Sequence, residues 1–219
     1  MLMSCWIDIS QPVNNQLAHW PGDQPFHYHT ALTKEMTGSV NIGRITTSAH
    51  VGTHTDAPYH FLDDGKKILD LEVDRYIGPC KVIDIGSFAA INEEALKSKI
   101  TQPTERLLIR TSLPNNPERF PDDVPPITAD GAAYMRSIGV HLVGVDTPSV
   151  DPVSSKDMIG HHSLFANDIY ILENVMLDHV DEGDYELIAL PLPLQDADGS
   201  LVRAVIKPIN GGNRDAEST

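Results

Sequence analysis

The sequence predicts an α/β protein built on a mixed sheet or a partly closed barrel, with few helices. Three observations support this prediction. Short β-rich segments recur along the chain, and several are too apolar for strands that leave one face to water. Helical patterns lie between only some of these segments. Strand-rich stretches at both ends flank the alternating middle, which disfavours a regular doubly wound fold.

The apolar strands should be covered on both faces. The expected strands are residues 41–49, 81–85, 106–111, 140–145, 169–172, 186–190 and 202–207. Each expected helix follows a residue whose side chain can accept a hydrogen bond from the first helical turn. These helices are 93–99 after Asn92, 129–137 after Thr128, and 156–161 after Ser154 or Ser155. A proline-rich loop is expected at 113–126.

Length favours a single domain, and charge disfavours a nucleic-acid partner. The chain has 219 residues, and 16 Lys and Arg against 31 Asp and Glu give a net charge of −15. We expect one domain over residues 1–209 and a disordered tail over 210–219. The negative charge disfavours nucleic acid, and no apolar run is long enough to span a membrane. The first residues carry no export signal, so we expect a cytoplasmic protein.

The most informative segment places three histidines and one aspartate within eleven residues, from His50 to His60. Imidazole and carboxylate ligands suit Zn²⁺, Mn²⁺ or Fe²⁺. Gly52, neighbouring threonines and a proline disfavour a helix, so we place His50 and His54 where a strand enters a loop. These two histidines and Asp56 are candidate ligands of one metal ion. The alternative is a loop of polar histidines that binds nothing.

A second group of candidates lies more than a hundred residues further along the chain. Glu173 ends an apolar strand, where a buried carboxylate without a partner is costly. His161 and His162 lie at the end of the expected third helix, and their side chains diverge, so the residues alone do not choose between them. A metal ion bound by Glu173 would offset that cost. The alternative is a strand-end carboxylate that faces water.

His60 and Trp20 are candidates for substrate chemistry. An imidazole with a pKa of roughly 6.5 can carry protons near neutral pH, although His60 could instead be a packed histidine beside Phe61. Trp20 lies in a loop before Pro21 and Gly22, where its ring can either stack on an aryl group or pack within the protein.

Other polar pairs are set aside. His27 and His29 would share one face of a strand and could form a separate metal pair, but no nearby acid completes it. Asp196 and Asp198 precede a glycine and indicate a turn, because the rest of a calcium-binding loop is missing. No site is therefore assigned to these four residues.

The run from His50 to His60 resembles the signature of the cyclase-like metal-dependent amidohydrolases, His-x-Gly-Thr-His-x-Asp-x-Pro-x-His, which is unbroken here. Within that family the sequence is most similar to the bacterial-type kynurenine formamidases, or arylformamidases. The similarity covers nearly the whole chain except the polar tail. Supporting segments are residues 6–12, 20–23, 144–149, 171–174 and 183–192.

The resemblance implies a compact mixed α/β fold of the swivelling-domain type, a homodimer, and two zinc ions per subunit. By matching positions, His50, His54 and Asp56 would bind one ion. Asp56 would also bridge to the second ion, which His161 would hold, and Glu173 would contact both. The resemblance therefore selects His161 from the adjacent histidine pair.

The activity that the resemblance implies is hydrolysis of N-formyl-L-kynurenine to L-kynurenine and formate, a step of tryptophan degradation. Zinc lowers the pKa of bound water to about 7, so a metal-held hydroxide would attack the formyl carbon. His60 would carry protons, and Trp20 would line the substrate pocket. Two alternatives are a related amide or lactone hydrolase of the isatin hydrolase kind and a non-catalytic metal-binding or small-molecule-binding protein. The intact His60 argues against the second, because simple binding needs no proton carrier.

Overall fold

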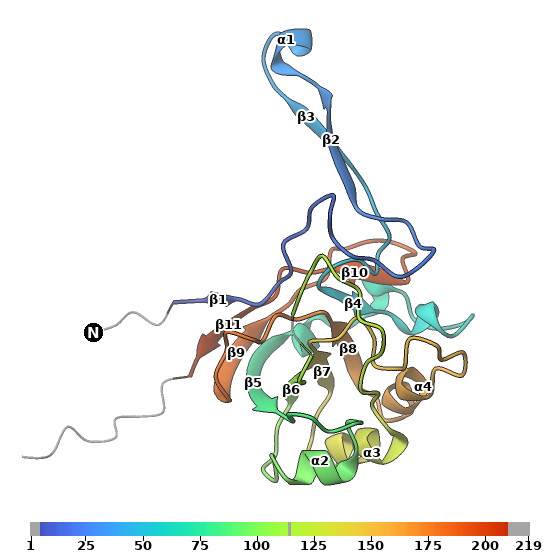
Figure 1. Cartoon of the computed structure of the whole chain (residues 1–219), viewed down its shortest axis with the longest axis vertical. Helices are drawn as coiled ribbons and strands as arrows, with labels where there is room; N and C mark the ends of the chain where they lie inside the picture. The colour runs from blue at the N-terminus through green and yellow to red at the C-terminus, as the bar shows by residue number, and fades with distance from the viewer. Residues whose placement is uncertain (1–4, 114, 210–219) are drawn as a thin grey trace, which may run out of the picture.

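A curled, mixed sheet forms the body of the protein and confirms the expected fold class. The computed structural model describes residues 5–113 and 115–209, so the expected tail at 210–219 lies outside the described residues. Among the described residues, nine strands form one sheet in the order β1-β11-β9-β5-β6-β7-β8-β4-β10. The sheet curls into a half-barrel, with helices α2, α3 and α4 gathered at one side (Figure 1).

The strands are mostly short and the helices few. The strands are β1 (Ile7–Asp8), β2 (His27–Leu32), β3 (Ile42–Thr46), β4 (His54–Asp56), β5 (Ile77–Asp84), β6 (Arg106–Arg110), β7 (Leu142–Val145), β8 (Tyr170–Glu173), β9 (Gly183–Ile188), β10 (Gly199–Leu201) and β11 (Val205–Pro208). The α-helices are α1 (Lys34–Thr37), α2 (Glu93–Lys97), α3 (Ala129–Ser137) and α4 (Ile159–Ala166). None of the helices in the described part of the chain is long and apolar enough to cross a bilayer.

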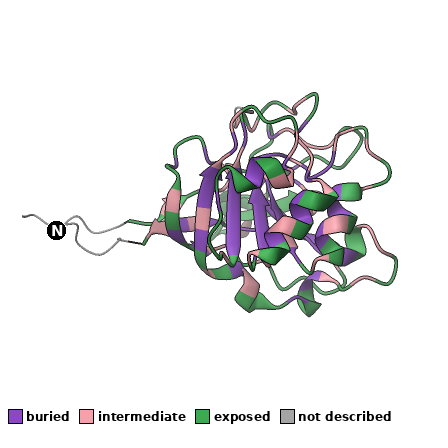
Figure 2. Ribbon diagram, turned by 90° about the horizontal axis from the view of Figure 1, so that it is seen from below, coloured by how far each residue is buried: buried purple, intermediate pink, exposed green. Residues whose placement is uncertain are grey.

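The centre of the sheet is parallel and apolar on both faces. Strands β5, β6, β7 and β8 pair in parallel, and α2, α3 and α4 lie on the connections between them. Leu107 and Ile109 on β6 pack in the core beneath the helices, while Leu108 packs in the core on the other face. Figure 2 shows these buried strands beside helices whose outer faces are exposed. This arrangement explains the continuous apolar runs in the sequence, because neither face reaches water.

The register of three strands at one edge of the sheet positions the candidate site. Strand β4 lies antiparallel between β8 and β10. In this register His54 is opposite Glu173, and Asp56 is opposite Gly199. Because side chains alternate along a strand, His54 and Asp56 share one face of β4, and Thr55 points to the other face. Residues distant in the sequence thereby meet at one edge.

Strands β2 and β3 form a separate hairpin that stands away from the body, with α1 at its tip (Figure 1). Every residue of β3 is exposed, and so is every residue of β2 except Ala31, which is half-buried. His27 and His29 lie on one face of this hairpin with ring centroids 5.2 Å apart. Among the described residues, no group of three potential metal ligands includes either of these histidines.

The structure corrects the expected third helix. Helix α4 spans Ile159–Ala166 and begins later than the expected 156–161. Neither serine caps it: Met158 is the N-cap residue, and Ser155 Oγ accepts a hydrogen bond from the Met158 amide in the preceding turn. His161 and His162 therefore lie inside the helix rather than at its end. Asn92 and Thr128 do cap α2 and α3, as predicted.

The sequence also missed several strands. Strands β1, β2, β4 and β10 have no counterpart among the expected segments. Three of the four are only two or three residues long, and β4 reads His-Thr-Asp, without an apolar residue. Such segments carry no periodic signal, and pairing with neighbouring strands makes them extended.

Candidate metal centre

The structure brings His50, His54 and Asp56 together. His50 lies in the turn before β4, where Gly52 adopts φ of +68°, a left-handed conformation that favours glycine. His50 Nδ1 is 2.8 Å from Asp56 Oδ1, and His54 Nε2 is 3.5 Å from the same oxygen. Two imidazole nitrogens and one carboxylate oxygen thus converge on one point, as the first metal site requires.

The second group of predicted residues meets the first through Asp56. The other oxygen of Asp56, Oδ2, is 3.3 Å from His161 Nε2. Glu173 Oε2 is 3.3 Å from His54 Nε2, while Glu173 Oε1 is 3.8 Å from His161 Nε2. Asp56 therefore directs one oxygen toward His50 and His54 and the other toward His161. Glu173 likewise directs one oxygen toward His54 and the other toward His161. His161 is buried and His162 is exposed, so burial favours His161 as the ligand.

The far ring nitrogens of two histidines are held by fixed acceptors. His54 Nδ1 lies 2.8 Å from the Gly52 carbonyl oxygen. His161 Nδ1 lies 2.6 Å from Asp151 Oδ2, and the Asp151 carboxylate also accepts the backbone amides of Gly160 and His161 at 2.7 and 3.0 Å. Such contacts fix the orientation of each ring and leave Nε2 free to bind a metal. No pattern in the sequence singled out Asp151.

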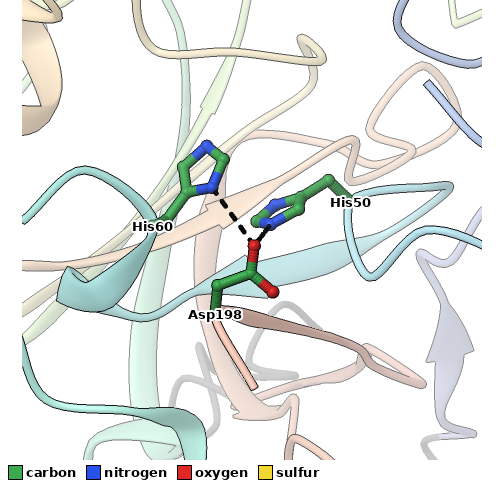
Figure 3. A group of neighbouring side chains, drawn as sticks. All are labelled: His50, His60 and Asp198. Carbon is green, nitrogen blue, oxygen red and sulfur yellow. Dashed lines mark hydrogen bonds and ion pairs between the residues drawn. The ribbon is translucent and has the colours of Figure 1, made fainter. Parts of the chain in front are cut away.

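Asp198, which the sequence assigned to a turn without a site, belongs to this cluster. Its Oδ2 is 3.1 Å from His50 Nε2 and 3.7 Å from His60 Nδ1 (Figure 3). The β4–β10 register places Gly199 opposite Asp56 and so brings Asp198 beside the histidines. A Cβ atom on Gly199 would lie 2.6 Å from the His50 ring, so a side chain does not fit there. Asp198 is 148 residues from His50, and only the strand pairing reveals their contact.

His60 lies at the exposed side of the cluster, as a proton carrier requires. It ends the 3-10 turn Pro58–His60, and its ring centroid is 4.0 Å from that of His50. One ring nitrogen of His60 also lies within 4.8 Å of an Asp56 carboxylate oxygen and of a His161 ring nitrogen, so geometry alone allows His60 to be a ligand as well. Burial lowers the pKa of His60, with the charges on the neighbouring histidines acting in the same direction.

The two buried carboxylates require positive charge beside them. Burial and the nearby Asp56 carboxylate raise the pKa of Glu173. Burial would also raise the pKa of Asp56, but His50 and His161 hold it well below its usual range. Burial alone would lower the pKa of His50 and His161, yet their carboxylate partners raise each to about 10. A donor set of three imidazoles and two carboxylates, without a thiolate, fits divalent cations such as Zn²⁺.

A cavity of about 360 Å³ opens above this cluster. Histidine and glutamate side chains of the cluster form part of its lining, and Trp20 and Phe120 form an aromatic wall with ring centroids 5.4 Å apart. Trp20 packs edge-to-face on Phe120 in this wall. A flat aromatic group fits such a wall.

Comparison with known proteins agrees with this geometry. The sequence model of the Cyclase family, described as "Putative cyclase", matches residues 7–152. The chain is 55% identical over 209 residues to a kynurenine formamidase from Bacillus cereus (strain ATCC 14579), which covers 95% of this chain and 100% of that enzyme. The chain therefore belongs to the cyclase family. Within that family its sequence matches bacterial kynurenine formamidases along their full length.

Solved structures share the fold at low sequence identity. A predicted metal-dependent hydrolase from Bacillus stearothermophilus has a TM-score of 0.79 at 22% identity, covering 94% of this chain and 98% of that chain. Isatin hydrolase A from Labrenzia aggregata, bound to benzyl benzoate, has a TM-score of 0.77 at 19% identity, covering 93% of both chains. At these identities the likeness establishes the fold.

Proposed function

We propose that this protein is an arylformamidase that hydrolyses N-formyl-L-kynurenine to L-kynurenine and formate in tryptophan degradation. The observation that carries the proposal is the cluster of three histidines and two carboxylates, all buried except the half-buried His50, at the floor of an aromatic-walled cavity. The 55% identity to the kynurenine formamidase of Bacillus cereus over its full length supports this choice of substrate. We also propose that residues 1–209 form one domain, because the sheet combines strands from β1 to β11.

The five ligands would hold two zinc ions. His50, His54 and Asp56 would hold one, and His161 would hold the other, with Asp56 and Glu173 shared between them. The support is that each carboxylate turns one oxygen toward each half of the cluster. Zinc, when bound, lowers the pKa of water and polarises a carbonyl group.

His60 is the proton carrier in this proposal. Hydrolysis of an aryl formamide needs a group that takes a proton during attack and returns it to the departing nitrogen. His60 is exposed beside the buried ligands, and its pKa lies below the usual value for histidine. An imidazole that is neutral near neutral pH can accept that proton. Trp20 would hold the aryl ring against the cavity wall.

The deciding experiment is an assay with formylkynurenine on protein stripped of metal by a chelator, before and after zinc is added back. We expect activity to be lost on stripping and restored by zinc. Activity that persists after verified metal removal would contradict the proposal. A parallel assay with isatin tests the closest alternative, and preference for isatin would favour it. Binding of formylkynurenine without conversion would favour the non-catalytic alternative.

We further propose that the protein forms a homodimer through the β2–β3 hairpin. An isolated two-stranded hairpin is marginally stable in water, and this one exposes Tyr28, Ile42, Ile45 and the α1 residue Met36. A second copy that covers these side chains would stabilise the hairpin. Light scattering after size-exclusion chromatography should give twice the mass of one chain, and Ile45→Glu should shift it toward the monomer. Location in the cytoplasm stays a prediction.

A further inference from the structure

Two cationic side chains line the cavity of this strongly acidic protein. The chain has 31 acidic residues against 16 Lys and Arg. Arg119 and Lys156 nevertheless both line the cavity above the metal centre. The mechanism described above uses neither of them. Since the described residues give Lys156 no ion-pair partner, its charge is available to a ligand.

Lys156 lies on a loop that is tied to the metal centre. The loop joins Asp151 to α4, and the Asp151 carboxylate accepts hydrogen bonds from the Gly160 amide and the His161 ring. Between these points the Ser155 amide donates to the Pro152 carbonyl oxygen at 2.8 Å. The ends of the loop are therefore held at fixed positions relative to a candidate metal ligand. This arrangement keeps the exposed Lys156 beside the cavity.

Arg119 lies on the proline-rich loop that forms another part of the cavity. This loop is attached to the loop of Trp20, since the Ala18 amide donates to the Pro117 carbonyl oxygen at 2.7 Å. The Trp20–Phe120 ring contact adds to that attachment. The nearest acid to the Arg119 guanidinium is Asp122 at 3.9 Å, and the Arg119 side chain is 75% exposed. Such an exposed pair is weak, so the guanidinium can turn to a stronger anion.

We propose that Lys156 and Arg119 bind the α-carboxylate of the substrate's amino-acid group, while the aryl formamide lies between the Trp20 wall and the metal centre. This inference rests on the proposed function. A carboxylate suits both cations, and a guanidinium can hold it through two parallel hydrogen bonds. The exposed Asp23 also lines the cavity and provides the opposite charge that a zwitterionic amino acid requires. The two cations would therefore distinguish amino-acid substrates from neutral aryl amides.

The test compares two substrates that differ only in whether they carry the amino-acid group. N-Formyl-L-kynurenine carries the amino acid, and the N-formyl derivative of 2-aminoacetophenone presents the same aryl formamide without it. In Lys156→Gln and in Arg119→Gln we expect KM for formylkynurenine to rise roughly three- to tenfold, with kcat little changed. The double variant should show a larger rise, while kcat/KM for the truncated substrate stays at the wild-type value. Lys97→Gln is the matched control, because Lys97 pairs with Glu93 on α2 and does not line the cavity.

Binding of the product gives a second readout that does not depend on turnover. By calorimetry, L-kynurenine should bind the double variant more weakly than the wild type, while 2-aminoacetophenone binds both equally. An equal decrease in kcat/KM for both substrates, or an unchanged KM for formylkynurenine, would overturn the inference. If the wild type hydrolyses neither substrate, the proposed function itself fails. The two failures are thus distinguishable.

Discussion

His54 and Glu173 face each other across the β4–β8 ladder, with His54 Nε2 3.3 Å from Glu173 Oε2. The two side chains come from strands that are far apart in the sequence and adjacent in the sheet. Both are buried, and both contribute to the cluster that would hold the metal ions. The strand register therefore decides whether the centre exists.

Replacing His54 should remove both metal and activity. His54→Ala deletes a nitrogen that lies near both Asp56 and Glu173. We expect the variant to bind less zinc and to lose formamidase activity. Metal content by plasma mass spectrometry checks this result. His162→Ala is the control, because His162 is exposed and should keep both metal and activity. A full metal complement in His54→Ala would refute the assignment.

Replacing His60 should separate turnover from metal binding. Loss of a general acid–base group typically costs about 10²–10⁴-fold in rate. His60→Ala should therefore lose most of its kcat and retain its zinc. The same preparation is measured for kcat and for metal content. Loss of one zinc ion per subunit would show instead that His60 is a ligand, as its distance from Asp56 and His161 permits.

Asp198→Asn should impair activity through His50 and His60. The carboxylate lies 3.1 Å from His50 Nε2, and an amide there orients the ring less strongly. Loss of such a partner typically costs about 10- to 100-fold in metal affinity or activity. Zinc affinity and kcat are both measured. Asp196 lies in the same segment, and its carboxylate pairs with Lys67. Asp196→Asn should therefore leave zinc affinity and kcat unchanged. Equal behaviour of the two variants would count against a positioning role for Asp198.

Asp146→Asn should stabilise the protein, and more so at high pH. Burial raises the pKa of Asp146 to about 7, and its Oδ1 has no hydrogen-bond partner among the described residues. A carboxyl with a raised folded-state pKa binds its proton more tightly than in the unfolded chain, so stability falls as pH rises from about 4 to 7. At 1.36 kcal/mol per pKa unit, this cost reaches at most about 4 kcal/mol.

Urea unfolding of wild type and variant across this pH range checks the prediction. The Thr111 amide donates to Asp146 Oδ2 at 2.9 Å, and asparagine keeps an oxygen for that bond. The stability difference should therefore grow with pH and level off above about pH 8. If the difference in unfolding free energy between variant and wild type did not change with pH, ionisation of Asp146 would not be what destabilises the wild type.

The sequence predicts the central sheet and most of the candidate ligands because both have local signals. The apolar runs of β5 to β8 follow from burial on two faces. The ligand segment from His50 to Asp56 is dense enough to recognise in one dimension. For Glu173, a carboxylate at the end of an apolar strand indicates a buried charge that needs a partner.

The remaining parts of the site have no such signal. Asp198 and Asp151 are single acids in loops, and they reach the histidines only through the β4–β10 pairing and the first turn of α4. Strand β4 consists of polar residues that are buried because they contact polar groups of the neighbouring strand: His54 lies 3.3 Å from Glu173, and Thr55 donates to the Ile171 carbonyl oxygen. The start of α4 was misplaced because Ser155 stabilises a turn rather than the helix. These features depend on tertiary contacts that local propensity does not contain.

The antiparallel edge β8-β4-β10 also constrains the order of events in folding. Shifting β4 by one residue would turn His54 and Asp56 to the opposite face, so no partly registered chain presents the complete set of ligands. Metal ions would then bind late in folding, after β8, β4 and β10 have paired, because a chain without this pairing brings only some of the candidate ligands together. Once captured, they would favour the native state by mass action, which makes availability of the cation a determinant of the protein's lifetime.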